Sequence, residues 1–148
     1  MSIYLKENPA YLRASLDSII NQTIPPAEIV MVKDGPLTKE LDSVLAEYDR
    51  RYPGIFSFIA YEENHGLGYA LHRGMLACAN DIVARMDTDD IARSDRMEKQ
   101  LKAIQDGLDM VGSQVIEFVE SPDKPIARTD LPEGLNNIIA CSKRRNPF

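Results

Sequence analysis

Apolar residues gather along this chain in short runs of strand length, separated by longer segments in which they recur at helical spacing. The clearest run is EIVMVK at residues 28–33, where continuous apolar residues predict a strand buried on both faces. Similar runs predict strands at residues 55–61, 82–86 and 110–118, and residues 2–4 have the character of a strand end. We therefore expect a chain built on several short, largely buried strands.

The segments between these strands predict helices. Asn8 and Pro9 suit a helix start, because Asn accepts hydrogen bonds from free N–H groups and Pro fits the first helical position. Leu12, Leu16 and Ile19 then fall on one face of that helix. Comparable spacing predicts further helices over residues 41–48, over residues 67–79, after residue 94 and near residues 135–139.

The regular alternation of strand and helix predicts the fold class. Strands joined through helices pair in parallel by right-handed crossovers, and the helices cover both faces of the sheet. The expected architecture is therefore α/β, a three-layer, Rossmann-like, mostly parallel sheet with helices on both faces. The composition indicates no domain boundary before about residue 120.

Composition and charge narrow the class of protein. The 148 residues suffice for one domain with a real core, and 44% of them are hydrophobic. The net charge of −6 argues against a nucleic-acid-binding groove, so we expect no nucleic-acid partner. No apolar run approaches the ~20 residues of a membrane span. Cys78 and Cys141 lack metal-type spacing and are typical of reduced thiols in a cytosolic protein.

Polar side chains follow four successive predicted strands at the point where each strand ends. Tyr4 follows the first strand, Asp34 the second and Asn64 the third, while Asp87 and Asp89 follow the fourth. In open α/β sheets, ligands bind outside the carboxyl ends of the strands. This coincidence predicts a ligand site at that edge, independently of any family resemblance.

The stretch DTDD at residues 87–90 is the candidate metal site. Asp87 and Asp89 are two residues apart, so in an extended backbone they would point the same way and share Mg²⁺ or Mn²⁺. Such ions take phosphate oxygens as further ligands. A solvated turn of three aspartates, with Asp90 capping the next segment of the chain, is the simpler alternative, because the D-x-D pattern is weak by itself.

Two further segments have open interpretations. Asp34, in VKDG, can accept N–H groups of a nucleobase or ribose hydroxyls, or can simply form an Asp-Gly turn. Gly66 and Gly68 precede or begin a helix, where backbone can approach an anionic ligand closely. His72 could face such a ligand or lie on the helix surface. With two histidines in the chain, a zinc site is not expected.

Taken together, three segments resemble the family 2 glycosyltransferases of the GT-A fold. They are SIYLKENPAYLRASLDSIINQTIPPAEIVMVKDGPLT, NHGLGYALHRGMLACANDIVARMDTDD and SDRMEKQ, which stand in the family's order. The likeness is strongest to bacterial enzymes of exopolysaccharide, capsule and O-antigen biosynthesis, including the amylovoran branch. It implies an inverting transferase that moves a sugar from a nucleotide sugar, usually UDP-linked, to a growing cell-surface glycan.

The resemblance assigns roles to individual positions. It implies that Asp89 and Asp87 form the metal site for Mn²⁺ or Mg²⁺, with Asp89 the more direct ligand. Asp34 would contact the base, and Asp90 would lie near the donor sugar. The residues implied to bind the nucleotide sugar are Tyr4, Glu7, Asp34, Asn64, Gly68, His72, Asp87 and Asp90.

Two departures from the family pattern bear on activity. The family's DDGS is KDGP here, with Lys33 in place of the first aspartate. The chain also ends at CSKRRNPF, before the segment that carries the acceptor site and the catalytic base in the family. We therefore expect residues 1–148 to be the donor-binding part of a longer enzyme, trimmed also at its N-terminus, with the base beyond Phe148. A non-catalytic nucleotide- or metal-binding α/β module remains the alternative.

The family also implies partners and a location. The donor would be a nucleotide sugar, and the acceptor a glycan or a lipid-linked saccharide. The enzyme would be cytoplasmic, in peripheral association with membrane-bound acceptor at the inner face of the plasma membrane.

Overall fold

The computed structural model describes residues 1–119 and 121–144, in two compact units, Met1–Lys99 and Gln100–Phe148. The division falls inside a helix, earlier than composition indicated. The first unit contains β1 (Ser2–Ile3), α1 (Pro9–Ile20), β2 (Ile29–Lys33), α2 (Lys39–Arg51), β3 (Phe56–Ala60) and α3 (Leu67–Ala77). α4 (Arg96–Gln105) spans the boundary between the units. The second unit then contains β4 (Val115–Phe118), β5 (Pro125–Thr129) and α5 (Leu135–Ser142).

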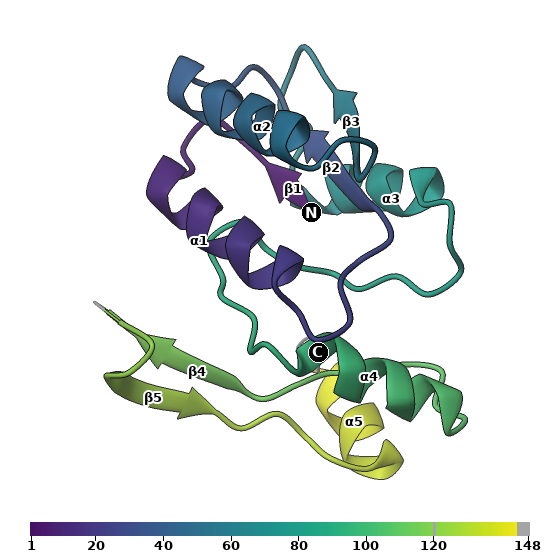
Figure 1. The fold of residues 1–148 in the computed structure, drawn as a ribbon. Coiled ribbons are helices and arrows are strands. Elements are labelled where there is room, and N and C mark those ends of the chain that lie inside the picture. Colours follow the sequence, from purple (N-terminus) through teal and green to yellow (C-terminus); the bar gives the residue numbers. More distant parts are fainter. Residues whose placement is uncertain (120, 145–148) are drawn as a thin grey trace. The chain divides into compact units, whose positions relative to one another are not determined.

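The first unit is built on a three-stranded parallel sheet in the order β1-β2-β3 (Figure 1). Val32 in the central strand pairs with Ser2 on one side and with Ile59 on the other. β2 is buried from Ile29 to Val32, as its continuous apolar run predicts. The expected parallel pairing is confirmed for these strands.

Helices cover both faces of this sheet (Figure 1). The apolar sides of α1 and α2 pack on one face, and α3 packs on the other, against β2 and β1. Ala70 of α3 is fully buried, and Gly74 lies so near β2 that an added Cβ would stand 3.1 Å from the Val32 side chain. The core between the sheet, α1 and α2 consists of Ile3, Leu12, Leu16, Met31, Leu41, Val44, Leu45 and Tyr48. The predicted three-layer α/β architecture is therefore confirmed.

The predicted strand at residues 82–86 is wrong, because this segment forms no ladder with another strand. Ile82 and Val83 are 54% and 43% exposed, whereas Met86 is buried. Apolar composition favours a strand, but a strand also needs a hydrogen-bonding neighbour. β1 is only two residues long and offers little edge for pairing.

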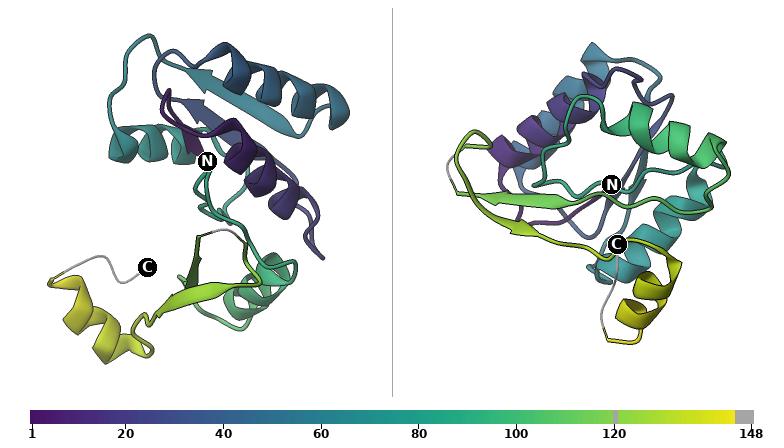
Figure 2. Two further views of the ribbon diagram at one scale, coloured as in Figure 1. Left: turned by 90° about the vertical axis from the view of Figure 1, so that its left-hand side faces the viewer. Right: turned by 90° about the horizontal axis from the view of Figure 1, so that it is seen from below.

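The second unit also departs from the predicted elements. The expected strand at residues 110–118 is reduced to β4, which pairs antiparallel with β5 in a hairpin (Figure 2). β5 falls in a segment for which the sequence analysis gave no strand, and its pairing with β4 supplies the backbone partners that local sequence did not reveal. α5 includes the predicted helix near residues 135–139. Among the described residues, no helix combines the length and apolar character needed to cross a membrane.

Candidate functional site

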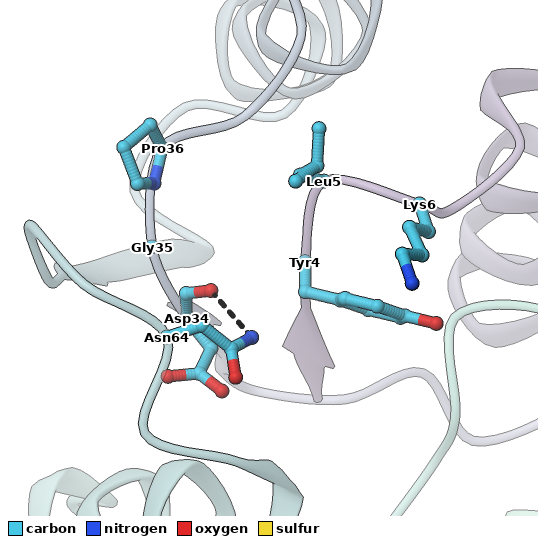
Figure 3. Close-up of a pocket in the computed structure, with 7 residues that line it drawn as sticks. All are labelled: Tyr4, Leu5, Lys6, Asp34, Gly35, Pro36 and Asn64. Carbon is cyan, nitrogen blue, oxygen red and sulfur yellow. Dashed lines mark hydrogen bonds between the residues drawn. The ribbon is translucent and has the colours of Figure 1, made fainter.

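A pocket of about 280 Å³ opens where β1 and β2 end, beside the loop that follows β3 (Figure 3). It contains three of the predicted site residues, Tyr4, Asp34 and Asn64. Its lining consists of Tyr4, Leu5, Lys6, Asp34, Gly35, Pro36 and Asn64. The pocket lies at the carboxyl ends of parallel strands, which is where strand topology predicts a ligand.

Asp34 organises the loop on one side of this pocket. Its buried carboxylate accepts the backbone N–H of His65 at 2.8 Å and that of Gly66 at 2.9 Å. The Asn64 side chain donates to the Asp34 carbonyl at 3.1 Å (Figure 3). Gly35 has a φ of +91°, and an added Cβ would lie 3.1 Å from the Asn64 backbone nitrogen. The backbone bends at Gly35, and Asp34 holds the start of α3 in addition to lining the pocket.

Negative charge is concentrated next to this pocket, in Glu7, Asp87, Asp89 and Asp90, which we call the acidic cluster. A turn closed by the Glu7 N–H and the Tyr4 carbonyl, at 3.2 Å, connects it to the pocket. Burial, followed by the charges of Asp89 and Asp87, raises the pKa of Glu7 above its ordinary value. The same causes in the same order raise the pKa of Asp90. Asp87 and Asp89 are therefore close enough to Glu7 and to Asp90 to disfavour their ionised forms.

Arg85, to which the sequence analysis assigned no role, places a positive group among these carboxylates. Its Nη2 donates to both carboxylate oxygens of Asp87, at 2.9 and 2.8 Å. The backbone turns at Thr88 and Asp89, so the predicted extended alternation of Asp87 with Asp89 fails. Two-residue spacing instead brings Arg85 and Asp87 together. The sequence ARMD at residues 84–87 contains this two-residue spacing of Arg85 and Asp87. Predicting the ion pair from it required knowing where the extended backbone ends and the turn begins.

Polar side chains on α1 and just after it hold the segment that carries Asp87, Asp89 and Asp90. Ser15, fully buried, donates its hydroxyl to the Asp87 carbonyl at 2.9 Å. Ser18 accepts the Ala92 N–H at 3.0 Å. Gln22 donates to the Arg93 carbonyl at 2.7 Å and accepts the backbone N–H of residue 97 at 2.9 Å. These contacts take the place of the strand pairing that was predicted to position the aspartates.

A second arginine supports the same segment from α4. Nη2 of Arg96 donates to the Arg85 carbonyl at 2.8 Å, and Nη1 contacts the sulfur of Met86 at 3.0 Å. Burial lowers the pKa of Arg96 from its ordinary value, while the charges of Asp90 and Asp87 act in the opposite direction. The guanidinium therefore supplies positive charge to the acidic cluster while fixing the backbone before it.

Other predicted residues lie outside the pocket. Gly68 and His72 are on exposed positions of α3 and do not line it, so their roles stay predictions. Lys33, which replaces the family's aspartate, pairs with Asp42 of α2 at 2.7 Å. A group of rings that the sequence analysis missed stands at the start of α3, where His65 lies 4.8 Å from Tyr69 between ring centroids.

The acidic cluster has the donor chemistry of a hard-cation site. Carboxylate oxygens are the ligands that Mg²⁺ and Mn²⁺ prefer. The Asp89 carboxylate makes no hydrogen bond or ion pair within residues 1–119 and 121–144, whereas Asp87 is paired with Arg85. Across those same residues, no three His, Cys, Asp or Glu side chains are arranged to hold a metal. A cation would therefore rely on Asp89 and Asp87 and on oxygens from its ligand.

Comparison with known proteins places these features in context. Residues 1–145 match the family described as Glycosyl transferase family 2. The amylovoran biosynthesis glycosyltransferase AmsE of Erwinia amylovora is 38% identical over 150 residues, covering 100% of this chain and 55% of that protein. The UDP-Gal:alpha-D-GlcNAc-diphosphoundecaprenol beta-1,3-galactosyltransferase of Escherichia coli is 40% identical over 151 residues, covering 100% and 54%. The chain thus spans about half the length of these curated relatives.

A solved structure is similar in fold. The mannosyltransferase PcManGT from Pyrobaculum calidifontis, in complex with GDP-Man and Mn²⁺, matches with a TM-score of 0.62 at 20% identity. The match covers 72% of this chain and 32% of that protein. It confirms the α/β fold of GT-A type that the sequence resemblance implied.

Proposed function

Because the chain belongs to Glycosyl transferase family 2, we propose that residues 1–148 form the donor-binding part of an inverting glycosyltransferase. The donor is a nucleotide sugar, UDP-linked, and the product is a cell-surface glycan. Nucleotide-sugar names among its relatives support a donor of this class: one is named for UDP-Gal, and a solved neighbour holds GDP-Man.

The arrangement that carries the proposal is the pocket of Tyr4, Asp34 and Asn64 next to the acidic cluster. We assign the pocket to the nucleoside, with Tyr4 and Asp34 beside the base. The diphosphate would extend toward Asp87 and Asp89. The turn between Tyr4 and Glu7 connects the pocket to these aspartates. Gly68, His72 and Asp90 keep their proposed places along the donor. A nucleoside diphosphate needs a polar pocket for the nucleoside and a cation for the diphosphate, and the acidic cluster that adjoins the pocket supplies carboxylates for that cation.

The metal site is assigned to Asp89 and Asp87. A bound Mn²⁺ or Mg²⁺ would neutralise the diphosphate as it leaves the anomeric carbon. Asp89 offers its carboxylate to the cation, and the Ser15 hydroxyl fixes the Asp87 backbone beside it. Lys6 lines the pocket and supplies positive charge on the nucleoside side.

Acceptor activation is assigned outside these residues. Inverting transfer needs a base that takes the proton of the acceptor hydroxyl. We place that base and the acceptor site beyond Phe148, in the part that the relatives have and this chain does not cover. The acceptor is proposed to be a lipid-linked saccharide at the inner face of the plasma membrane, because one relative is named for a diphosphoundecaprenol substrate.

Ligand-dependent thermal unfolding tests the proposal. A ligand that binds only the folded state raises stability by mass action, so even weak donors register at high concentration. UDP should raise the melting temperature more with Mn²⁺ than with EDTA, and more than ADP does. Equal shifts for all nucleotides, or no effect of the metal, would contradict it. Sugar transfer to an acceptor by these 148 residues alone would show that the base lies within them.

A further inference from the structure

Arg85 and Asp87 form an ion pair at the position where the proposed function places a metal. One nitrogen of the guanidinium reaches both oxygens of the carboxylate, at 2.9 and 2.8 Å. Those are the oxygens that a cation would need. In this structure the charge of Asp87 is therefore balanced by a side chain of the same segment.

The pair is built so that its side chains can separate while its backbone stays in place. The Arg85 side chain is 48% exposed and that of Asp87 is 38% exposed, so water can solvate both when they part. The backbone is held independently: Arg96 donates to the Arg85 carbonyl, and Ser15 donates to the Asp87 carbonyl. Exchange of partners at Asp87 thus requires only rotation of side chains.

We propose that Arg85 is an internal counter-ion, which holds Asp87 in the metal-free protein and passes to the donor diphosphate when a divalent cation takes Asp87. This inference rests on the proposed function, since it assumes that the acidic cluster receives a metal and a diphosphate. It adds a positioning residue to which the sequence resemblance assigned no role.

The exchange makes metal and donor binding cooperative. Without a nucleotide, the cation and the guanidinium compete for the same two oxygens, and metal binding leaves Arg85 without its carboxylate. A diphosphate gives the guanidinium a new partner, because arginine pairs with phosphate oxygens in a fork geometry. Each ligand therefore favours binding of the other, and the coupling must be reciprocal.

Isothermal titration calorimetry with Mn²⁺ measures the competition between the cation and Arg85 for Asp87. Without nucleotide, Arg85→Gln should bind Mn²⁺ roughly two- to fivefold more tightly than the unmodified chain, the range that an exposed ion pair is worth. In the presence of UDP, this advantage should shrink or reverse, because the variant lacks the group that meets the diphosphate. Arg85→Lys keeps the charge and should bind Mn²⁺ nearly as weakly as the unmodified chain.

Arg13→Gln is the matched control. Arg13 pairs with Glu47 at 2.7 Å, with exposed fractions of 42% and 44%, on the pair of helices that carries no acidic cluster. Removing it should leave Mn²⁺ affinity unchanged, with and without UDP. Circular dichroism and melting curves show that each variant is folded. Arg85→Met, which also removes the charge, carries the test if Arg85→Gln does not fold.

The outcomes separate this inference from the proposed function. If Arg85→Gln binds Mn²⁺ equally or more weakly without nucleotide, or if no variant binds Mn²⁺, the counter-ion role is overturned. If the variant binds Mn²⁺ more tightly but no protein binds UDP, the counter-ion role at Asp87 holds, its transfer to a diphosphate is overturned, and the proposed donor binding fails. Tighter Mn²⁺ binding together with reduced coupling to UDP supports both parts.

Discussion

The carboxylate of Asp34, at the end of β2, accepts the backbone N–H of Gly66, the residue that caps the start of α3, at 2.9 Å. Gly66 has no side chain with which to cap the helix, and its φ is +89°. Asp34 supplies the missing acceptor from another element, and its negative charge suits a helix N-terminus. A residue that sequence reasoning assigned to a nucleobase thus also determines where α3 begins.

Replacing Asp34 with Asn should destabilise the fold. The amide offers only one acceptor oxygen, so the N–H of His65 or of Gly66 loses its partner at a partly buried site. The expected loss is about 1–3 kcal/mol of unfolding free energy, measured by urea denaturation. Asp106→Asn, at an exposed pair with Lys102, is the control and should change stability by less than about 0.5 kcal/mol. Equal stability of the two variants would contradict the capping role.

Replacing Asp89 with Asn should leave the fold intact and remove metal-dependent binding. Asp89 is exposed, and its carboxylate has no hydrogen bond or ion pair in the part of the chain that the structure describes, so stability should change by less than about 0.5 kcal/mol. The extra rise in melting temperature that Mn²⁺ gives to UDP should disappear. A variant that unfolds, or that keeps the full effect of Mn²⁺, would make Asp89 structural.

Gly35→Ala should be more destabilising than Gly54→Ala. Both glycines have positive φ, at +91° and +83°, so both substitutions strain the backbone. Only at Gly35 would the new Cβ meet a neighbour, the Asn64 backbone nitrogen at 3.1 Å. Gly54→Ala should cost about 1 kcal/mol and Gly35→Ala about 1–2 kcal/mol more, in chemical denaturation. Gly35→Ala should also weaken UDP binding, because it displaces the pocket wall.

Glu7→Gln should stabilise the metal-free protein in a pH-dependent manner. Burial, Asp89 and Asp87 raise the pKa of Glu7 in the folded state, so its favourable contribution is present at low pH and is lost as pH rises through that pKa. A permanently neutral glutamine avoids this loss. We expect a higher unfolding free energy than the unmodified chain near pH 7 in EDTA, and no gain below about pH 4.

Mn²⁺ provides the control for that experiment. A cation among the carboxylates lowers the cost of ionising Glu7, so the gain from Glu7→Gln near pH 7 should be smaller with Mn²⁺ than with EDTA. A gain of equal size at every pH would mean that glutamine acts through packing and not through charge.

Local periodicity determined much of the first unit. β2, α1, α2 and α3 lie where the apolar spacing predicted them, and the strand-end rule correctly brought Tyr4, Asp34 and Asn64 to one pocket. These features depend on side-chain burial within one segment and on the handedness of crossovers, which are properties of short stretches of chain. The resemblance to the glycosyltransferase family was likewise readable from motifs in order.

The tertiary structure alone decided how the acidic cluster is held. Residues 82–86 look like a strand, yet strand formation depends on a neighbouring edge, and β1 is too short to provide one. Ser15 instead holds Asp87 across 72 positions of sequence, and Gln22 holds the chain beyond it. The sequence analysis predicted a divalent cation at Asp87 and Asp89 and gave no role to Arg85. That Arg85 pairs with Asp87 followed only from the place where the backbone stops being extended, which contacts distant in sequence determine.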